Sequence, residues 1–323
     1  MHPFVRAAAL AVLTACASVS NAAEEFPRKT VRMIAPFAPG GATDVLARLV
    51  SQKLSERWTQ SVIVDNRTGA GGHIGAEIAA RSPLDGYTLL VAGAPHAIGM
   101  SLYRKLNYDL AKDLAPVNCI ATFPSAIIVH PSLPVKTVKD LIAVAKAHPG
   151  ELNFGSAGSG SPNHLALELF KTMAKVSMVH VPYKGGSGQM VGDLLAGQVQ
   201  LASMGLPPAM PYVKSGRLRV VAITSTKRSP LMPEAPTVSE SGLPGFDVSS
   251  WYGIFGPAGL PRDIVTRVNA DITAVLGTAD MKERLAALGA DPAPMTPENL
   301  GQLVRDEITK WAKVVKESGA KVD

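Results

Sequence analysis

Three glycine-rich segments of the 323-residue chain hold the residue types best suited to binding an anion. They span residues 36–44, 155–164 and 182–188, and each follows a short stretch that predicts a β-strand. Glycine allows the backbone to approach a ligand closely, and a helix that begins in such a loop presents unpaired N–H groups. Those groups, at the positive end of the helix dipole, attract carboxylate or phosphate. The three segments therefore predict a site for an anionic ligand.

The candidate ligand-binding residues are mainly small, hydroxyl-bearing and aromatic residues of these segments. Ser161 is expected to be the N-cap of a helix with Pro162 at its first position, and Asp44 is expected to cap its helix rather than to catalyse a reaction. A single loop of this kind is usually an ordinary strand-to-helix turn, but three in one chain favour a shared site. The full set is Phe37, Ala38, Gly40, Gly41, Thr43, Asp44, Ser156, Gly158, Ser159, Ser161, His164, Tyr183, Lys184 and Gly185.

Signatures of catalysis or metal binding are missing from these loops. None ends in the Gly-Lys-Ser/Thr of a nucleotide-binding loop, and no serine in them is centred in a Gly-x-Ser-x-Gly elbow. The histidines and cysteines lack the spacing of a zinc site, and no pair of carboxylates is placed for acid–base work. We therefore expect no catalytic residue, metal or cofactor. His96 is a further candidate for ligand contact, whereas His73 and Trp251 are expected to be scaffold residues.

The first half of the chain has the order expected of a parallel sheet. Residues 31–35 form a strand-like run, and apolar residues at helical spacing follow between 45 and 54. A second strand, a short helix and a third strand are predicted at 61–65, 74–81 and 88–91. The order βαβαβ implies parallel strands joined by crossover helices.

A second α/β block follows, and the chain closes with helices. The predicted strands of the block are 126–129, 152–154, 179–181 and 218–223, and its predicted helices are 138–147, 165–173 and 190–196. The tail has a loop-rich stretch, a strand at 252–255, and helices at 264–276 and 300–317.

This order predicts two α/β lobes, since the chain is longer than one hydrophobic core usually serves. Residues 23–125 are expected to form the first part of lobe 1, residues 126–225 lobe 2, and residues 226–323 a return to lobe 1. Ligands of open α/β sheets bind beyond the carboxyl ends of the strands. The ligand cleft is therefore expected between the lobes.

The N-terminus predicts export. Residues 1–22 have the basic start, apolar run and small-residue cleavage site of a signal peptide. Cys16 also stands in a lipobox-like context, so lipid anchoring is an alternative to release into the periplasm, which we favour. Cleavage leaves Cys119 as the one remaining cysteine, expected to be buried. No later apolar run approaches the ~20 residues of a transmembrane helix.

The charge pattern gives no indication of nucleic-acid binding. The formal net charge is +6 at pH 7, but the basic residues are scattered rather than clustered. Such a mild positive excess favours small anionic ligands.

Short motifs occur in a fixed order along nearly the whole mature chain. They are Pro36-Phe37-Ala38-Pro39-Gly40-Gly41, Asp65-Asn66-Arg67 before Gly69-Ala70-Gly71-Gly72, Asp85-Gly86-Tyr87-Thr88-Leu89-Leu90, Gly155-Ser156 to His164-Leu165-Ala166, Val181-Pro182-Tyr183-Lys184-Gly185, Asp193-Leu194-Leu195-Ala196-Gly197 and Trp251-Tyr252-Gly253. As an ordered set they resemble the extracytoplasmic receptors of tripartite tricarboxylate transporters, the TctC-like or Bug receptors.

The resemblance implies a type II periplasmic binding protein fold whose two lobes close on a carboxylate-bearing solute. In the family, the loops that match residues 37–44 and 156–164 face the ligand, and 183–185 lies beside them. Backbone N–H groups, hydroxyls and bridging water hold the solute, and a membrane permease receives it. The chain departs from the common family pattern at Thr68, Gly99, Gly188 and Met204-Gly205, which affects the identity of the ligand rather than the fold.

The leading prediction is a monomeric periplasmic receptor that binds a small organic carboxylate and passes it to the inner-membrane permease of a tripartite tricarboxylate transporter. A dicarboxylate, a tricarboxylate, an acidic amino acid or an aromatic acid would suit the loops. One alternative is an α/β enzyme, such as a transferase, with its active site in the same cleft. Another is a sensory receptor that presents its solute to a signalling partner.

Overall fold

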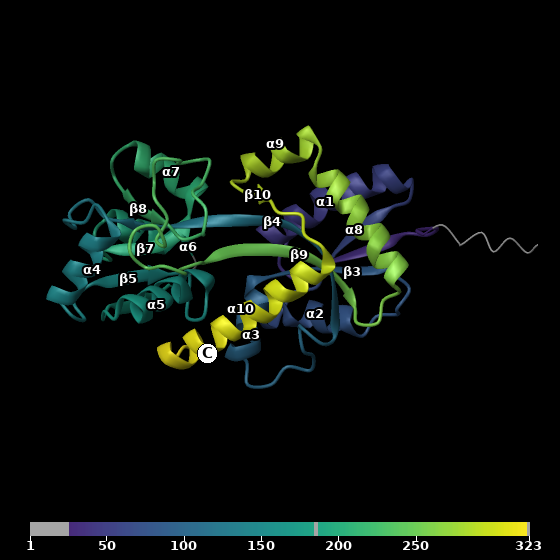
Figure 1. Cartoon of the computed structure of the whole chain (residues 1–323), viewed down its shortest axis with the longest axis horizontal. Helices are drawn as coiled ribbons and strands as arrows, with labels where there is room; N and C mark the ends of the chain where they lie inside the picture. The colour runs from purple at the N-terminus through teal and green to yellow at the C-terminus, as the bar shows by residue number, and fades with distance from the viewer. Residues whose placement is uncertain (1–25, 184–186, 322–323) are drawn as a thin grey trace, which may run out of the picture.

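Two long antiparallel strands, β4 (Leu114–Val129) and β9 (Ser249–Pro257), connect the two lobes of the molecule (Figure 1). The computed structural model describes residues 26–183 and 187–321. The other strands are β1 (Val31–Ala35), β2 (Val62–Asn66), β3 (Thr88–Gly93), β5 (Asn153–Ser156), β6 (Val179–Pro182), β7 (Leu201–Gly205), β8 (Arg219–Ile223) and β10 (Asp291–Pro292). The helices are α1 (Ala42–Trp58), η1 (Ala70–Gly72), α2 (His73–Ala80), α3 (Ala94–Leu102), α4 (Val138–Ala147), α5 (Pro162–Ala174), α6 (Ser187–Leu195), α7 (Leu206–Lys214), α8 (Arg262–Leu276), α9 (Ala279–Ala287) and α10 (Pro297–Ser318).

The first lobe is built on three parallel strands. β1 lies between β2 and β3 and pairs with both in parallel, which confirms the predicted order, and β9 is the antiparallel neighbour of β3. Met33 packs in one buried cluster with residues of α1 and α8, whereas Ile34 packs in another with residues of α2 and α3. Successive side chains of a strand point to opposite faces, so helices cover both sides of this sheet.

The second lobe repeats the parallel arrangement. β5 lies between β6 and β7 and is parallel to both, while β7 and β8 pair antiparallel with the second half of β4. The sequence did not predict β7, because this short strand is buried throughout most of its length and lacks the alternation of a half-exposed strand. The sequence also did not predict α3, α7 or α9; α7 carries two prolines in its first turn and a third inside the helix.

The registers of β4 and β9 fix the direction of the other strands. The last residue of β3, Gly93, pairs with Tyr252 near the start of β9, and the last residue of β7, Gly205, pairs with Ser125 of β4. β1 and β2 run parallel to β3, and β5 and β6 run parallel to β7. The carboxyl ends of the parallel strands in both lobes therefore point toward the central crossing, and the loops after them face each other across it.

β4 changes partners as it passes between the lobes. Residues 114–124 pair with β9, and residues 125–129 pair with β7 and β8. The sequence predicted only the end of this strand, because Pro116 and Pro124 interrupt its pattern, and the ladder shifts register just after Pro116.

The loop-rich residues 226–248 lie against β8, although the sequence placed them in the return to lobe 1. The Val238 N–H donates to the Ile223 carbonyl at 2.8 Å, and the Val248 N–H donates to the Thr224 carbonyl at 2.8 Å. The return strand β9 starts directly after this segment. We therefore propose lobe boundaries at 124/125 and 248/249.

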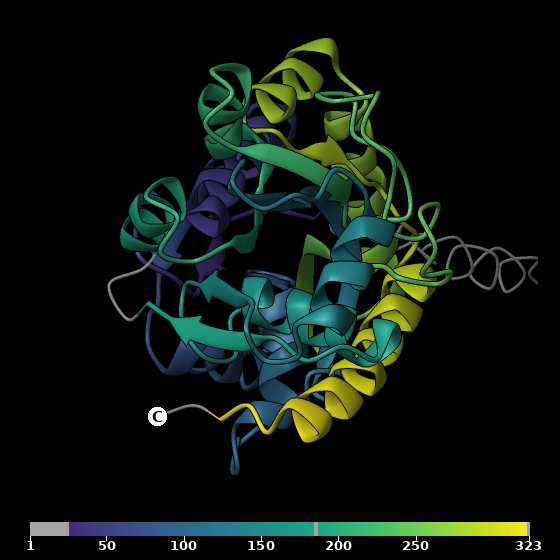
Figure 2. The ribbon, with the colours of Figure 1, turned by 90° about the vertical axis from the view of Figure 1, so that its left-hand side faces the viewer.

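Helix α10 packs against both lobes along one side of the molecule (Figures 1 and 2). The hydroxyl of its N-cap, Thr296, accepts a backbone N–H bond, and Gly319 follows its last residue with a left-handed φ of 67°. Trp311 of this helix belongs to a buried cluster that includes Leu90 of the first lobe and Phe154 of the second. One hydrophobic core thus continues from lobe to lobe beside the crossing strands.

A buried carboxylate joins α10 to β9. Glu307 is 6% exposed, and its Oε2 accepts hydrogen bonds from the indole N–H of Trp251 at 3.2 Å and of Trp311 at 2.8 Å. Lys310 forms an ion pair with the other carboxylate oxygen. Trp251 is 2% exposed, which confirms its predicted place in the core. Loss of the carboxylate would leave two buried N–H donors without their partner.

Replacement of Glu307 by leucine is expected to lower the free energy of unfolding by about 2–4 kcal/mol, because two buried donors lose their acceptor and Lys310 loses its counter-ion. Glu307→Gln, which keeps one acceptor oxygen, is the matched control and should lose less. Urea unfolding of the three proteins measures both values. Equal stability of Glu307→Leu and the parent protein would contradict the role assigned to this carboxylate.

Candidate functional site

The loop between β1 and α1 exposes its backbone toward the crossing. Gly40 and Gly41 are exposed, and Gly40 adopts a left-handed φ of 83°. Gly41 is the N-cap of α1 and contributes no side-chain cap, so the first N–H groups of the helix have no side-chain acceptor there. Thr43 is 4% exposed, and its hydroxyl makes no hydrogen bond with a residue of the described chain. Ala38, also predicted for the site, is exposed beside them.

Asp44 anchors this loop from beneath. The sequence predicted that Asp44 caps the helix, but the N-cap of α1 is Gly41. The Asp44 Oδ2 accepts a hydrogen bond from the Gly40 N–H at 2.9 Å, and its Oδ1 accepts one from the Asn66 amide at 2.9 Å. Arg48 forms an ion pair with the carboxylate at 2.9 Å, and the Asn66 amide also donates to the Phe37 carbonyl at 3.0 Å. The Arg48 hydrogen bond is the largest cause that lowers the pKa of Asp44 to about 2.

Buried aromatic rings support the same loop from α2 and α3. The half-buried Phe37 ring lies edge-on against His96, 5.9 Å between centroids, and His73 lies 5.6 Å from His96. The Tyr108 hydroxyl is 2.7 Å from His73 Nδ1. Burial lowers the pKa of His73 to about 4, and burial followed by the charge of His73 lowers that of His96 to about 3. Both rings are neutral scaffold groups at neutral pH, as was expected for His73.

The loop between β5 and α5 is the counterpart in the second lobe. Ser161 is the N-cap of α5 and accepts from the His164 N–H at 3.3 Å, with Pro162 at the first helical position, as predicted. Gly158 has a φ of 120°, so the tip of the loop takes a conformation that L side chains rarely adopt. Ser159 is exposed, and its hydroxyl makes no hydrogen bond with any residue of the described ranges.

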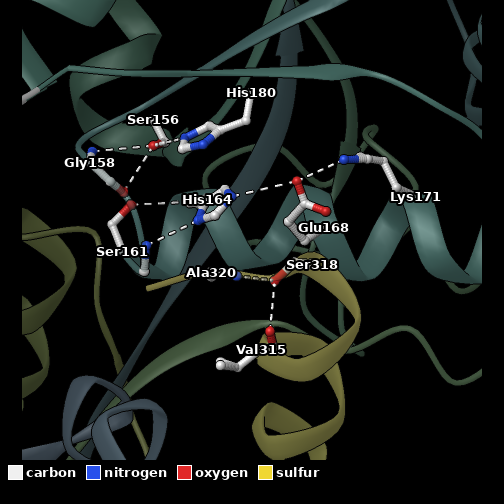
Figure 3. A network of polar contacts seen from close by, with 11 residues as sticks. Ser156, Gly158, Ser161, His164, Glu168, Lys171, His180, Val315, Ser318 and Ala320 are labelled. Atoms are coloured by element: carbon white, nitrogen blue, oxygen red, sulfur yellow. Dashed lines mark hydrogen bonds and ion pairs between the residues drawn. The ribbon is translucent and has the colours of Figure 1, made fainter. Parts of the chain in front are cut away.

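Three other predicted residues of this lobe are engaged within the protein. The Ser156 hydroxyl lies 2.6 Å from His180 Nε2, and His164 Nδ1 accepts from the Gly160 N–H at 3.0 Å (Figure 3). Tyr183 is 7% exposed and donates its hydroxyl hydrogen to Asp193 at 2.8 Å. Lys184 and Gly185, also predicted, lie outside the described residues.

Helix α3 spans the interval between the two loops. Its residue His96 contacts Phe37 of the first loop, and its residue Leu102 lies so close to Gly160 that a Cβ there would be 2.6 Å from the leucine methyl. These two points on α3 are about 9 Å apart along the helix axis. The exposed backbone of both loops is therefore held by one rigid element at a short separation.

Comparison with known proteins decides the family. Residues 46–320 match the family described as "Tripartite tricarboxylate transporter family receptor". Protein BugT of Bordetella pertussis is 39% identical over 313 residues, which cover 96% of each chain. The chain belongs to this receptor family.

Solved structures of similar receptors have the same fold. Rpa4515 of R. palustris, determined with adipate, is 40% identical with a TM-score of 0.75, over 92% of this chain and 99% of that chain. MatC of Rhodopseudomonas palustris, determined with bound malate, is 34% identical with a TM-score of 0.71, over 90% of this chain and all of that chain. The predicted two-lobed α/β fold of a type II periplasmic binding protein is confirmed.

The geometry of the TctC-like site suits binding by neutral donors. The exposed residues Gly40 and Ser159 and the hydroxyls of Thr43 and Ser159 lie on the loops that face each other. Within the described ranges, no group of three or more His, Cys, Asp or Glu side chains is arranged to hold a metal ion. No helix in the same ranges is long and apolar enough to cross a bilayer.

Sequence reasoning overlooked one residue beside this site, His180. It lies on β6, and nothing in the spacing to Ser156 or His164 indicates that the three side chains meet. Only the parallel pairing of β5 with β6, which sets Phe154 opposite His180, brings them together.

Asp44→Asn is expected to lower the unfolding free energy at neutral pH, because the amide cannot accept all the bonds now made to the carboxylate. The folded pKa of Asp44 lies below the ordinary 3.8 of an aspartate, so this stabilisation is complete above pH 3.8 and disappears as pH falls toward about 2. Urea unfolding from neutral pH downward should show the difference between the variant and the parent protein shrinking below pH 4. Glu283→Gln, at an exposed site on α9, controls for the loss of one negative charge; a pH-independent difference would refute the assignment.

Proposed function

We propose that this receptor binds a small dicarboxylate between its lobes and passes it to the permease of a tripartite tricarboxylate transporter. Two similar receptors were determined with adipate and with malate, both of which carry a carboxylate at each end. Their similarity to this chain extends over at least 90% of its length. A ligand with two carboxylates suits a site that has one donor loop on each lobe.

The observation that carries the proposal is the pair of facing loops with unused donors. Thr43 and Ser159 are the two hydroxyl groups on these loops that make no hydrogen bond with the described chain. A solute held by both loops contacts both lobes only when they are closed, so binding favours closure. Because the donors are neutral and water can bridge them to the ligand, related dicarboxylates should bind with similar affinity.

Several finer features belong to the same proposal. Residues 1–22 direct export, and the mature protein acts in the periplasm as a monomer without catalytic turnover, metal or cofactor. The ligand-binding set is the one predicted from the sequence, with Asp44, Ser156, Ser161, His164 and Tyr183 contributing through the backbone they hold rather than through direct contact. A transport role is preferred to a sensory one because the family is named for its transporter.

The test uses residues 23–323, freed of bound ligand and titrated with adipate, malate, citrate and benzoate. At a ligand concentration ~100 times the dissociation constant, the bound acid should add about 2.7 kcal/mol to the unfolding free energy. Thr43→Val and Ser159→Ala should each weaken binding by about 0.5–1.5 kcal/mol, since each removes one hydrogen bond. Ser177→Ala, at an exposed serine away from both loops, should bind like the parent protein. Stabilisation by none of the four acids would rule out the proposed ligand class.

A further inference from the structure

We propose that His164 and His180 are positioning residues that hold the 156–161 loop in its ligand-binding shape only while both imidazoles are neutral. The inference rests on the proposed function, because it concerns the donor loop of the second lobe. It adds that ligand capture by this receptor is sensitive to acid. Neither histidine needs to touch the ligand for this to hold.

The two rings form a tight stack next to the loop. Their centroids are 3.6 Å apart with an interplanar angle of 15°, and the Phe154 ring stacks on His180 at 5.1 Å. His164 comes from the first turn of α5, whereas His180 comes from β6 (Figure 3). Each ring therefore holds the loop from a different element.

The bond to Gly160 determines the proton position on His164. Nδ1 accepts from the Gly160 N–H at 3.0 Å, so Nδ1 carries no hydrogen and the single proton of the neutral ring is on Nε2. That nitrogen faces Glu168 at 3.5 Å. Protonation of His164 would place an N–H on Nδ1 directly against the N–H of Gly160. The bond that fixes the loop would then be lost.

His180 acts on the other end of the loop through Ser156. The Ser156 hydroxyl lies 3.1 Å from the Gly158 carbonyl and 3.2 Å from the Gly158 N–H, as well as 2.6 Å from His180 Nε2. All three contacts are satisfied when Ser156 donates to the Gly158 carbonyl and accepts from the Gly158 N–H and from His180 Nε2–H. This arrangement closes the turn at Gly158, next to the exposed Ser159.

The groups around the stack disfavour a second positive charge. Burial is the main cause that lowers the pKa of His180 to about 4, and the charges of His164 and Lys171 act in the same direction. Glu168 opposes them but is itself paired with Lys171 at 2.8 Å. The neighbouring strand β5 contributes only the uncharged Ser156 and Phe154 to the contacts of His180 among the described residues.

The sign of the pH effect follows from this arrangement. The ordered stack requires a His180 whose pKa lies below the ordinary 6.5, so the stabilisation that depends on neutral His180 is complete above pH 6.5 and is lost as pH falls toward about 4. Ligand affinity should fall over the same interval, beyond the loss caused by protonation of the ligand itself.

Two isosteric variants of His164 provide the decisive binding test. Asparagine places an oxygen acceptor close to the position of Nδ1, whereas glutamine places its amide near Nε2 and leaves the Gly160 N–H without an acceptor. By calorimetry with adipate at neutral pH, His164→Asn should bind within about threefold of the parent protein and His164→Gln about 3- to 10-fold more weakly. The ratio of parent to His180→Gln affinity cancels the titration of adipate and should fall as pH drops from about 6.5 to about 4, because glutamine keeps a donor near the position of Nε2 but does not titrate.

NMR of the unliganded parent protein tests the same inference without a ligand and without a mutation. Long-range ¹H–¹⁵N spectra of the imidazoles should show the Nε2–H tautomer for both histidines at neutral pH, and hydrogen exchange of the Gly160 amide should accelerate on acidification. An Nδ1–H tautomer for His164, or equal affinities of the asparagine and glutamine variants, would overturn the positioning role. Failure of the parent protein to bind adipate would count against the proposed function alone, since the tautomers and the Gly160 exchange are still read directly.

Discussion

The antiparallel pairing of β4 with β9 is the constraint on which the arrangement of this receptor depends. Each of these strands crosses between the lobes, and each fixes the direction of one set of parallel strands, through β3 in the first lobe and β7 in the second. Because a parallel strand must share the direction of its neighbour, these two pairings also fix the direction of the four further strands β1, β2, β5 and β6. The loops that leave the carboxyl ends of these strands then face each other across the crossing of β4 and β9.

In each of the two facing loops, some residues offer hydrogen-bond donors to a ligand, and others hold the loop in shape. Asp44 satisfies the Gly40 N–H from below, and His164 does the same for the Gly160 N–H in the other lobe. A carboxylate oxygen accepts this bond in one lobe, and an imidazole nitrogen accepts it in the other. The glycines of both loops take the left-handed conformation without steric strain, and buried side chains accept hydrogen bonds from the Gly40 and Gly160 N–H groups.

Helix α10 limits how freely the lobes move about the crossing. It shares a buried cluster with both lobes and is tied to β9 through Glu307, so any closing motion must preserve those contacts or rearrange them together. β4 changes partner at residues 124–125, and this position lies opposite the start of β9, because Pro124 pairs with Ser249. Bending concentrated there would move the loops toward each other while leaving each core intact.

The sequence by itself determined the parallel order of the first three strands, the N-cap at Ser161, the buried places of Trp251 and Cys119, and the two glycine-rich loops after β1 and β5 that carry the candidate site. These features depend on local patterns: the spacing of apolar residues, the turn preference of glycine and the capping preference of serine. Tertiary structure alone decided the rest. Strand β7 has no local pattern because it is buried on both faces, and β4 continues through prolines because β9 and β10 pair with it. Residues 226–248 lie against the end of β8 because Ile223 and Thr224 accept their backbone N–H bonds. His180 contacts Ser156 and His164 for the same reason, because the pairing of β5 with β6 brings these distant residues together. The local sequence pattern of each segment does not specify which strand it pairs with.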